Sequence, residues 1–367
     1  MPRVLVVAIV LIPLFSIGQT TLQPIFDVDE YLDGLSLAFY SSSIPDSNRR
    51  HLIADPYKQI FRSPETGFLN RWTYYQRSDN TGWIDTRGTV NQLPSWLGNF
   101  YAAMVPASGS LTLNDSTNFP YRLATDPRAM VHVGWLVGLG HIAPGIVSMI
   151  NKQYEESGTR NFILFGHSQG AGITFLLRSY LHYLQQDGSL PKDIILKTYC
   201  SGAPKPGNMY YAYDFDFITR GGWAYTIVNA SDWVPETPFS VQTLSDFNTV
   251  NPFTNAKVVL KKQKLLVRIA GTSIYNKLNR STRKAQKQFT KYLGHLVYKQ
   301  SKNVLPQLKQ PQYSKGNNYM RTGVPVILLG DDEYHRRFPD SQTNVFIHHM
   351  FQPYSYLAKK IYAKKND

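Results

Sequence analysis

A serine flanked by two glycines stands near the middle of the sequence. Residues 161–172 read NFILFGHSQGAG, in which a short apolar run meets a Gly-His-Ser-Gln-Gly pentapeptide. Glycines permit a tight turn between a strand and a helix, so the hydroxyl of Ser168 can project above the sheet as a nucleophile. A serine can attack a carbonyl group only with a histidine base, an acid that orients the base and donors for the oxyanion. The remaining sequence must therefore supply these partners.

The acid is sought after the serine, at the end of an apolar run. Asp232 follows YTIV and precedes Pro235, so we expect its carboxylate at the carboxyl edge of a sheet. A turn-forming role is the alternative for this residue. Asp331 and Asp332 also follow an apolar run, but we expect them to be turn or capping residues, which leaves Asp232 as the candidate acid.

The base is expected in a loop after the last strand. The histidines that follow the serine are His182, His295, His335, His348 and His349. The adjacent pair His348 and His349 lies between the last expected strand and the last expected helix, and its position alone leaves the choice between the two open. His182 falls within a helix and His295 within a basic segment. His167 is expected to point away from the serine and to pack against the core.

Two backbone N–H groups are candidates for binding the oxyanion. Gln169 follows the serine at the start of a helix, where the helix dipole favours negative charge. Thr89 follows Arg87-Gly88 after the apolar run WIDT, and it can add its hydroxyl to its backbone N–H.

The segments around these residues alternate between strand and helix. Expected strands end near Phe165, Gly202, Ala230 and Gly330, and a hairpin is expected within residues 67–89. Helical spacing is seen at residues 30–42, at about 143–156, from the serine to Gly188 and after His349. This alternation predicts an α/β chain with a mostly parallel central sheet flanked by helices. Asp214 and Asp216 alternate with aromatic residues in YDFDF, which indicates an edge strand.

The composition is that of a globular protein with one large domain and an insertion. The chain has 367 residues, of which 43% are hydrophobic and 17% charged. Cys200 is the single cysteine, so no intrachain disulfide can form.

One segment accounts for the whole net positive charge. Residues 247–330 hold sixteen Lys or Arg and no Asp or Glu, and the other 23 basic residues (39 less 16) face 25 acidic ones. Apolar residues such as Val258, Leu265 and Ile269 recur between the lysines at roughly helical spacing, as in an interfacial helix. We therefore expect a basic, helical insert at about 247–322 that docks on anionic membrane surfaces; a cap over the active site is the alternative.

The N-terminus has the pattern of a secretory signal peptide. Arg3 precedes apolar residues from Val4 to Phe15, and small residues at Ser16 and Gly18 suit cleavage before residue 19. We expect a signal peptide at residues 1–18 and a secreted or periplasmic domain at 19–367. An uncleaved membrane anchor is the less favoured alternative, because the run is short for a bilayer span.

Several motifs, in order, resemble the class 3 lipase family of α/β-hydrolases. They are IDTRGTVNQLPSWLGNF, VHVGW, ILFGHSQGAG, YCSGAPKPGN, IVNASDWVPETP and HHM. The resemblance implies an α/β-hydrolase fold with Ser168 as nucleophile, Asp232 as acid and Thr89 as oxyanion donor. For the base it favours His348, because the family often has a large apolar residue two positions later, here Met350; His349 is the alternate.

The chain departs from the family in two places. Gln169 stands where the family usually has leucine, which keeps the backbone donor but alters the pocket wall. The basic insert is not a common family feature, so its role cannot be carried over.

The predicted function is that of a secreted serine hydrolase that cleaves carboxylic esters. The resemblance favours a lipase acting on acylglycerols or related lipids, and a feruloyl-type esterase is an alternative. A non-catalytic protein that binds anionic lipid or polysaccharide is an alternative from another class. We expect no metal or organic cofactor, and the signal peptide argues against a nucleic-acid partner.

Overall fold

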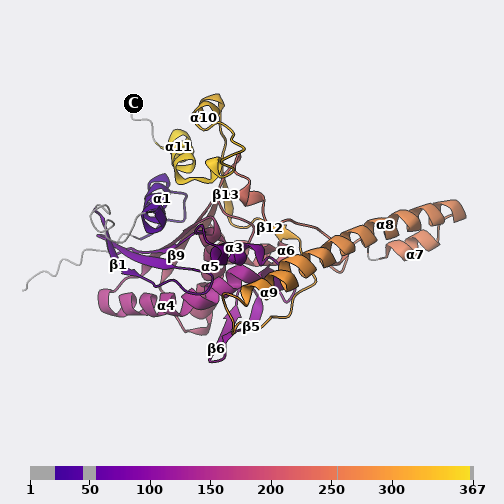
Figure 1. The fold of residues 1–367 in the computed structure, drawn as a ribbon, viewed down its shortest axis with the longest axis horizontal. Helices are drawn as coiled ribbons and strands as arrows, with labels where there is room; N and C mark the ends of the chain where they lie inside the picture. Colours follow the sequence, from indigo (N-terminus) through magenta and orange to yellow (C-terminus); the bar gives the residue numbers. More distant parts are fainter. Residues whose placement is uncertain (1–20, 44–54, 254, 364–367) are drawn as a thin grey trace, which may run out of the picture.

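A seven-stranded sheet forms the centre of the protein in a computed structural model, which describes residues 21–43, 55–253 and 255–363 (Figure 1). The expected signal peptide lies outside these ranges. The strands, in spatial order, are β1 (Tyr57–Arg62), β2 (Trp72–Arg77), β3 (Gly82–Thr86), β8 (Asn161–His167), β9 (Ile195–Ser201), β11 (Ala224–Asn229) and β13 (Val324–Leu328). The first three pair antiparallel, and β3, β8, β9, β11 and β13 run parallel. The prediction of a mostly parallel sheet is confirmed.

The strand β8 lies at the middle of the sheet and is buried along its whole length. Phe162 and Leu164 belong to one hydrophobic cluster, whereas Ile163 and Phe165 belong to another on the opposite face. Successive side chains of a strand point to opposite faces, so a continuous apolar run such as NFILF is stable only where both faces are covered.

Helices supply this cover on both sides of the sheet. α1 (Val28–Ser43) and α11 (Phe351–Tyr362) contact each other on one face, while α4 (Val133–Ser157) and α5 (Gln169–Asp187) pack together on the other (Figure 1). α4 is apolar and long enough to span a bilayer, but most of it is buried inside the protein, as in a core helix. This arrangement, with Ser168 between β8 and α5, is the α/β-hydrolase fold that was predicted.

Smaller elements complete the described part of the fold. The remaining strands are β4 (Met104–Pro106), β5 (Ser108–Asn114), β6 (Thr117–Arg122), β7 (Met130–His132), β10 (Gly207–Asn208) and β12 (Tyr319–Met320). The remaining helices outside the basic segment are α3 (Leu93–Phe100), α6 (Met209–Ile218), α10 (Asp332–Arg337) and the 3₁₀ turns η1 (Val234–Glu236), η2 (Leu244–Asp246) and η4 (Ile347–His349).

Two elements differ from the sequence prediction. α4 begins at Val133, ten residues before the expected start, because its glycines allow close packing: a Cβ at Gly134 would clash with the carbonyl oxygen of Gly98. The expected edge strand at YDFDF is wrong. Asp214 lies in helix α6, whose first turn is capped by the side chain of Asn208, so the alternation of acids and aromatics there has no strand meaning.

The basic segment divides into a projecting part and a packed part. α7 (Ala256–Lys261) and α8 (Leu265–Phe289) form an arm, residues 256–289, that extends away from the body (Figure 1). None of the side chains of these two helices, all of which are described, is buried. The chain then returns through a π-helical turn, η3 (Thr290–Leu296), and α9 (Val297–Ser301) to the core, where Leu308 is fully buried.

Candidate active site

The candidate nucleophile occupies a sharp turn between β8 and α5. Ser168 has φ 62° and ψ −130°, a conformation that residues other than glycine rarely adopt. The turn requires glycine at two positions where the backbone packs too closely for a side chain. A Cβ at Gly166 would clash with Gly170, and a Cβ at Gly170 would clash with the carbonyl oxygen of Thr86. The pentapeptide thus encodes a strained turn that holds the serine side chain at the end of the sheet.

Asp232 lies just beyond β11, and its carboxylate is buried and fully engaged. Oδ2 accepts hydrogen bonds from His349 Nδ1 at 2.6 Å and from the Tyr354 hydroxyl at 2.7 Å. Oδ1 accepts the backbone N–H of Val234 at 3.0 Å. Burial alone would raise the pKa of Asp232, but the contacts with His349 and the other donors outweigh it and lower this pKa. The carboxylate is therefore ionised at neutral pH and fixes the ring of His349.

The structure corrects the preference between the two adjacent histidines. His349, and not His348, contacts Asp232. His348 points to the other side of the 3₁₀ turn, where its ring lies between the Tyr334 hydroxyl at 2.6 Å and Asp340 Oδ1 at 2.8 Å. Neighbouring residues of a tight turn face different directions, so only one of the pair can reach the site.

His349 lines the same cavity as Ser168 and has one ring nitrogen without a partner among the described residues. Its Nε2 is buried and has no hydrogen-bond partner within the described part of the chain. Ser168, Thr89, Gln169 and His349 all line one cavity of about 1040 Å³. The other lining side chains are largely apolar and aromatic, including Trp96, Phe100, Trp135, Trp233, Phe239, Leu293, Phe346 and Phe351.

A chain of buried hydrogen bonds supports the backbone of His349. His167 Nε2 lies 2.8 Å from the carbonyl oxygen of His349, so this nitrogen carries the proton and donates it. Its Nδ1 then accepts from the Ser201 hydroxyl at 3.0 Å, and Ser201 in turn lies 2.8 Å from the hydroxyl of Tyr31 in α1. Burial, together with the charge of His349, lowers the pKa of His167 to about 3, so its ring stays neutral. The sequence had indicated only packing for His167.

The two candidate oxyanion residues approach the serine from different elements. Gln169 is the first residue of α5, where the helix offers its N–H no acceptor. Thr89 follows β3, in a loop anchored by Arg87, whose guanidinium donates to the carbonyl oxygen of Leu69 at 2.7 Å and bonds Glu65 at 2.8 Å.

The side chain of Asn99, at the end of α3, is hydrogen-bonded to both candidate oxyanion residues, Thr89 and Gln169. Its Nδ2 donates to Thr89 Oγ1 at 2.9 Å, which leaves the hydroxyl proton of Thr89 free to donate elsewhere. Its Oδ1 accepts from Gln169 Nε2 at 2.9 Å and from the indole N–H of Trp135 at 3.2 Å. Nothing in the sequence pattern singled out Asn99, because the link depends on how α3 and α5 meet.

The other predicted polar residues lie away from the cavity. Asp331 caps α10 by accepting the N–H of Tyr334, the capping role expected from the sequence. Within the described residues, His335, Asp340 and His348 lie close enough to share a cation. His335 and Asp340 are exposed, and His348 is already hydrogen-bonded on both ring nitrogens, so we assign no metal there.

The chain shares local sequence with secreted lipases. Residues 83–242 match the model of the family described as lipase (class 3). A secreted mono- and diacylglycerol lipase of Fusarium solani is 29% identical over 37% of this chain and 39% of its own length. Another, from Malassezia globosa, is 32% identical over 25% of this chain and 28% of its own. The chain thus spans two fifths or less of the length of these two relatives.

Solved structures of fungal lipases are also similar to the protein. A Rhizomucor miehei lipase propeptide complex aligns with a TM-score of 0.41 and 21% identity, over 57% of this chain and 62% of the other. Lipase II of Rhizopus niveus aligns with a TM-score of 0.40 and 21% identity, over 57% and 74%. The segment matched by the family model, residues 83–242, runs from β3 through Ser168 to Asp232 and the turn that follows it. The family model thus matches residues 83–242, less than half of this chain, and this part of the chain is similar to the class 3 lipase family.

Proposed function

We propose that the protein is a serine hydrolase that cleaves carboxylic esters, with Ser168, His349 and Asp232 as its catalytic residues. The observation that carries the proposal is the buried pair of Asp232 and His349: His349 lines the same cavity as the strained serine, and its Nε2 has no other partner in the described part of the chain. In this arrangement His349 accepts the proton of Ser168 as its oxygen attacks the ester carbonyl, and Asp232 stabilises the imidazolium.

The remaining steps use the same residues. The N–H groups of Thr89 and Gln169 and the hydroxyl of Thr89 bind the oxyanion of the tetrahedral intermediate. His349 then gives its proton to the leaving alcohol, which departs and leaves an acyl group on Ser168. A water molecule, deprotonated by His349, releases the acid and restores the serine.

For the substrate we propose an acylglycerol or a related lipid ester. The cavity is large and its walls are mostly apolar, as a long acyl chain requires. Two similar proteins are called secreted mono- and diacylglycerol lipases, which supports the same substrate class here.

We further propose that the protein is secreted and meets anionic membrane surfaces through its basic segment. The first 18 residues have the signal-peptide pattern, and the names of the relatives support secretion. The arm carries ten Lys or Arg and no acidic residue, so it is attracted to an anionic lipid layer.

A fluorophosphonate probe tests the catalytic proposal against a non-catalytic lipid- or polysaccharide-binding role. The purified protein is expected to be labelled stoichiometrically and to hydrolyse esters of increasing acyl length, with a preference for longer chains. The Ser168→Ala variant is expected to fold, to take up no label and to lose hydrolysis. Labelling of the alanine variant, or no labelling of the wild type, would reject Ser168 as nucleophile.

A further inference from the structure

The helix α8 of the arm carries an apolar stripe along one side. Val267, Ile274, Leu278, Ala285 and Phe289 are spaced by seven, four, seven and four residues, which places them on one face of a helix with 3.6 residues per turn. Ile274 is 59% exposed and Leu278 66% exposed. A helix of 25 residues is about 37 Å long, so the stripe extends far from the body.

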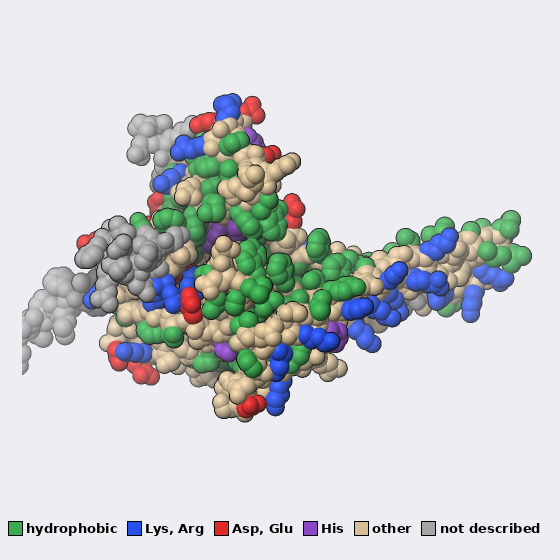
Figure 2. Space-filling model, viewed as in Figure 1, with side chains coloured by type: hydrophobic (Ala, Val, Ile, Leu, Met, Phe, Trp, Pro, Cys, Tyr) green, Lys and Arg blue, Asp and Glu red, His purple; other side chains and the backbone are tan. Residues whose placement is uncertain are grey.

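Basic side chains occupy the opposite side of the same helix. Arg280, Arg283 and Lys287 recur every three or four residues, and their positions lie well away from the stripe on a helical projection. In Figure 2 the arm shows hydrophobic side chains along its upper edge and at its tip, and Lys and Arg along its lower edge. An apolar face opposed by a Lys- and Arg-rich face is the pattern of a helix that lies in a membrane interface.

The stripe leads to the mouth of the catalytic cavity. Phe289, its last member, packs against Phe239 with ring centroids 6.0 Å apart. Phe239 lines the cavity and is 75% exposed, and Leu293, one turn after the stripe, lines the cavity as well. The stripe therefore faces the side of the molecule on which the cavity opens.

The rim of the cavity is itself apolar and exposed. Trp233 contacts Phe346, whose ring also contacts Trp96, and the centroid distances are 5.2 and 5.9 Å. The large apolar side chains exposed at this rim are Phe100, Trp233, Phe239 and Met350. Figure 2 shows the hydrophobic area of the body continuing onto the arm.

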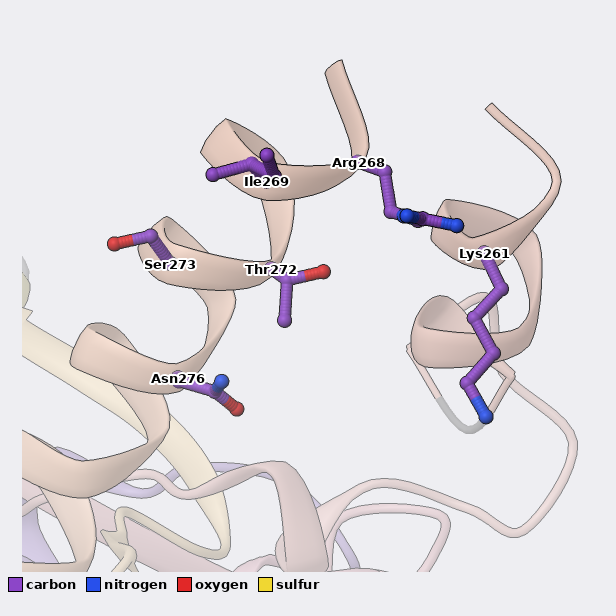
Figure 3. Close-up of a pocket in the computed structure, with 6 residues that line it drawn as sticks. All are labelled: Lys261, Arg268, Ile269, Thr272, Ser273 and Asn276. Carbon is purple, nitrogen blue, oxygen red and sulfur yellow. The ribbon is translucent and has the colours of Figure 1, made fainter. Parts of the chain in front are cut away.

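The far end of the arm combines apolar and cationic groups. Leu265, Leu266 and Ile269 are exposed in the first turn of α8. Nearby, Arg268 and Lys261 line the open hollow of about 620 Å³ between α8 and α7, and Arg268 points toward α7 (Figure 3). Arginine and lysine are the side chains that bind phosphate groups, and the hollow lies on the side of α8 away from the stripe, so this end suits phospholipid headgroups.

We infer that the stripe of α8 and the rim of the catalytic cavity form one docking surface for a bilayer that contains anionic phospholipid. The stripe and the rim face the acyl chains, while the basic side of α8 lies at the level of the headgroups. This inference deepens the proposed membrane contact and rests on it. Docking in this orientation turns the mouth of the cavity to the layer that holds the lipid substrate.

The charge of the arm favours a lipid layer over a second copy of the chain. Pairing two copies of α8 along their stripes would bring two helices without any acidic residue side by side, and no ion pair could offset the repulsion. An anionic lipid layer attracts the same charges and covers the same apolar face.

The orientation can be tested with an environment-sensitive fluorophore on single introduced cysteines. Cys200 is the natural cysteine and is buried, so new surface thiols can be labelled selectively. The variants are Leu278→Cys on the stripe, Phe239→Cys on the rim, Arg283→Cys on the basic side and Ser116→Cys on the distant β5–β6 hairpin as control. All are made in the Ser168→Ala background, so that binding is measured without lipid hydrolysis.

On vesicles of phosphatidylcholine with phosphatidylglycerol we expect blue shifts at positions 278 and 239 and none at 283 and 116. Binding should fall about tenfold or more when salt is raised from low to several times physiological strength, because the charges are screened. Equal shifts at 278 and 283, or no shift at 239 in bound protein, would overturn the orientation. Failure to bind at low salt would overturn docking itself, and the serine-probe experiment would still decide the catalytic proposal separately.

A pair of variants in the natural Ser168 background checks the two parts of the surface. Ile274→Asn with Leu278→Asn should weaken vesicle binding about tenfold or more through lost apolar contact. Arg283→Gln with Lys287→Gln should weaken it by about fivefold per charge at low salt only. Both should hydrolyse a soluble short-chain ester at the wild-type rate. Vesicle binding that neither pair weakens would reject α8 as the docking element.

Discussion

His167 Nε2 donates a hydrogen bond to the backbone carbonyl of His349 across 2.8 Å, so the residue before the candidate nucleophile holds the main chain of the candidate base. The ring centroids of the two histidines lie 4.7 Å apart. Because His167 is in turn fixed by Ser201 and Tyr31, the position of His349 depends on the core and not only on its own loop.

Replacing His167 by leucine is expected to lower kcat by about ten- to a hundredfold and to leave KM nearly unchanged, since a misplaced base slows the chemical step. His167→Gln retains a donor of similar reach and should recover part of the loss. Steady-state kinetics on a soluble ester measure both values. A leucine variant with wild-type kcat would show that the contact has no positioning role.

The two adjacent histidines should differ sharply. His349→Ala removes the base and is expected to reduce kcat by at least about a thousandfold. His348→Ala removes contacts to Tyr334 and Asp340 only, and a much smaller loss is expected. Parallel assays of the two purified variants decide the matter, and a more active His349→Ala protein would return the role to His348.

Gln169→Leu should destabilise the protein although it restores the residue common in the resembled family. The change removes the donor to the carbonyl oxygen of Ser95, which is buried, and to Asn99 Oδ1, which is partly buried, at a cost of about 1–3 kcal/mol. Thermal or urea unfolding measures this, with the exposed Gln288→Leu in α8 as a matched control. The backbone N–H survives, so activity should persist below the lowered melting temperature; equal stability of variant and wild type would mean that the bonds contribute nothing.

Two buried histidines predict that acid weakens the fold. Burial, as the largest cause, lowers the pKa of His132 and of His167 to about 3, from 6.5. Between these two pKa values the unfolded chain binds protons that the folded chain does not. The free energy of unfolding is therefore highest, as far as these histidines are concerned, above pH 6.5, and it falls as the pH drops towards 3. The slope is up to about 1.4 kcal/mol per pH unit for each histidine.

Urea unfolding between pH 7 and 4.5 measures this slope. His132→Gln should reduce the slope by the contribution of one proton, up to about 1.4 kcal/mol per pH unit. The contributions of all other titrating groups are the same in the variant and the wild type, so they cancel in the comparison. His295→Gln, a change in an exposed histidine, should leave the slope as it is. Identical slopes for His132→Gln and the wild type would contradict the prediction.

The parts of the site that follow from local pattern could be predicted from the sequence. The turn at Ser168 is encoded by its glycines, and Asp232 by its place after a buried strand. The choice between His348 and His349 could not be predicted, because it depends on the direction of each side chain in a 3₁₀ turn. Asn99 and Tyr354 reach the site only through tertiary packing. Asp214 is a related case. Its acidic and aromatic neighbours alternate as in a strand, but the segment forms the helix α6, which Asn208 caps.

The concentration of the net positive charge in residues 247–330 makes the charge distribution of the protein strongly asymmetric. That segment carries sixteen positive charges, and ten of them lie on the arm. In the rest of the chain the formal positive and negative charges nearly cancel. A charged surface exerts a torque on such a molecule before any contact is made, and the torque acts within a Debye length of about 8 Å at physiological ionic strength. The arm would arrive first and the body would swing in behind it, so that at low salt encounters with an anionic layer are more often productive than random approach would allow.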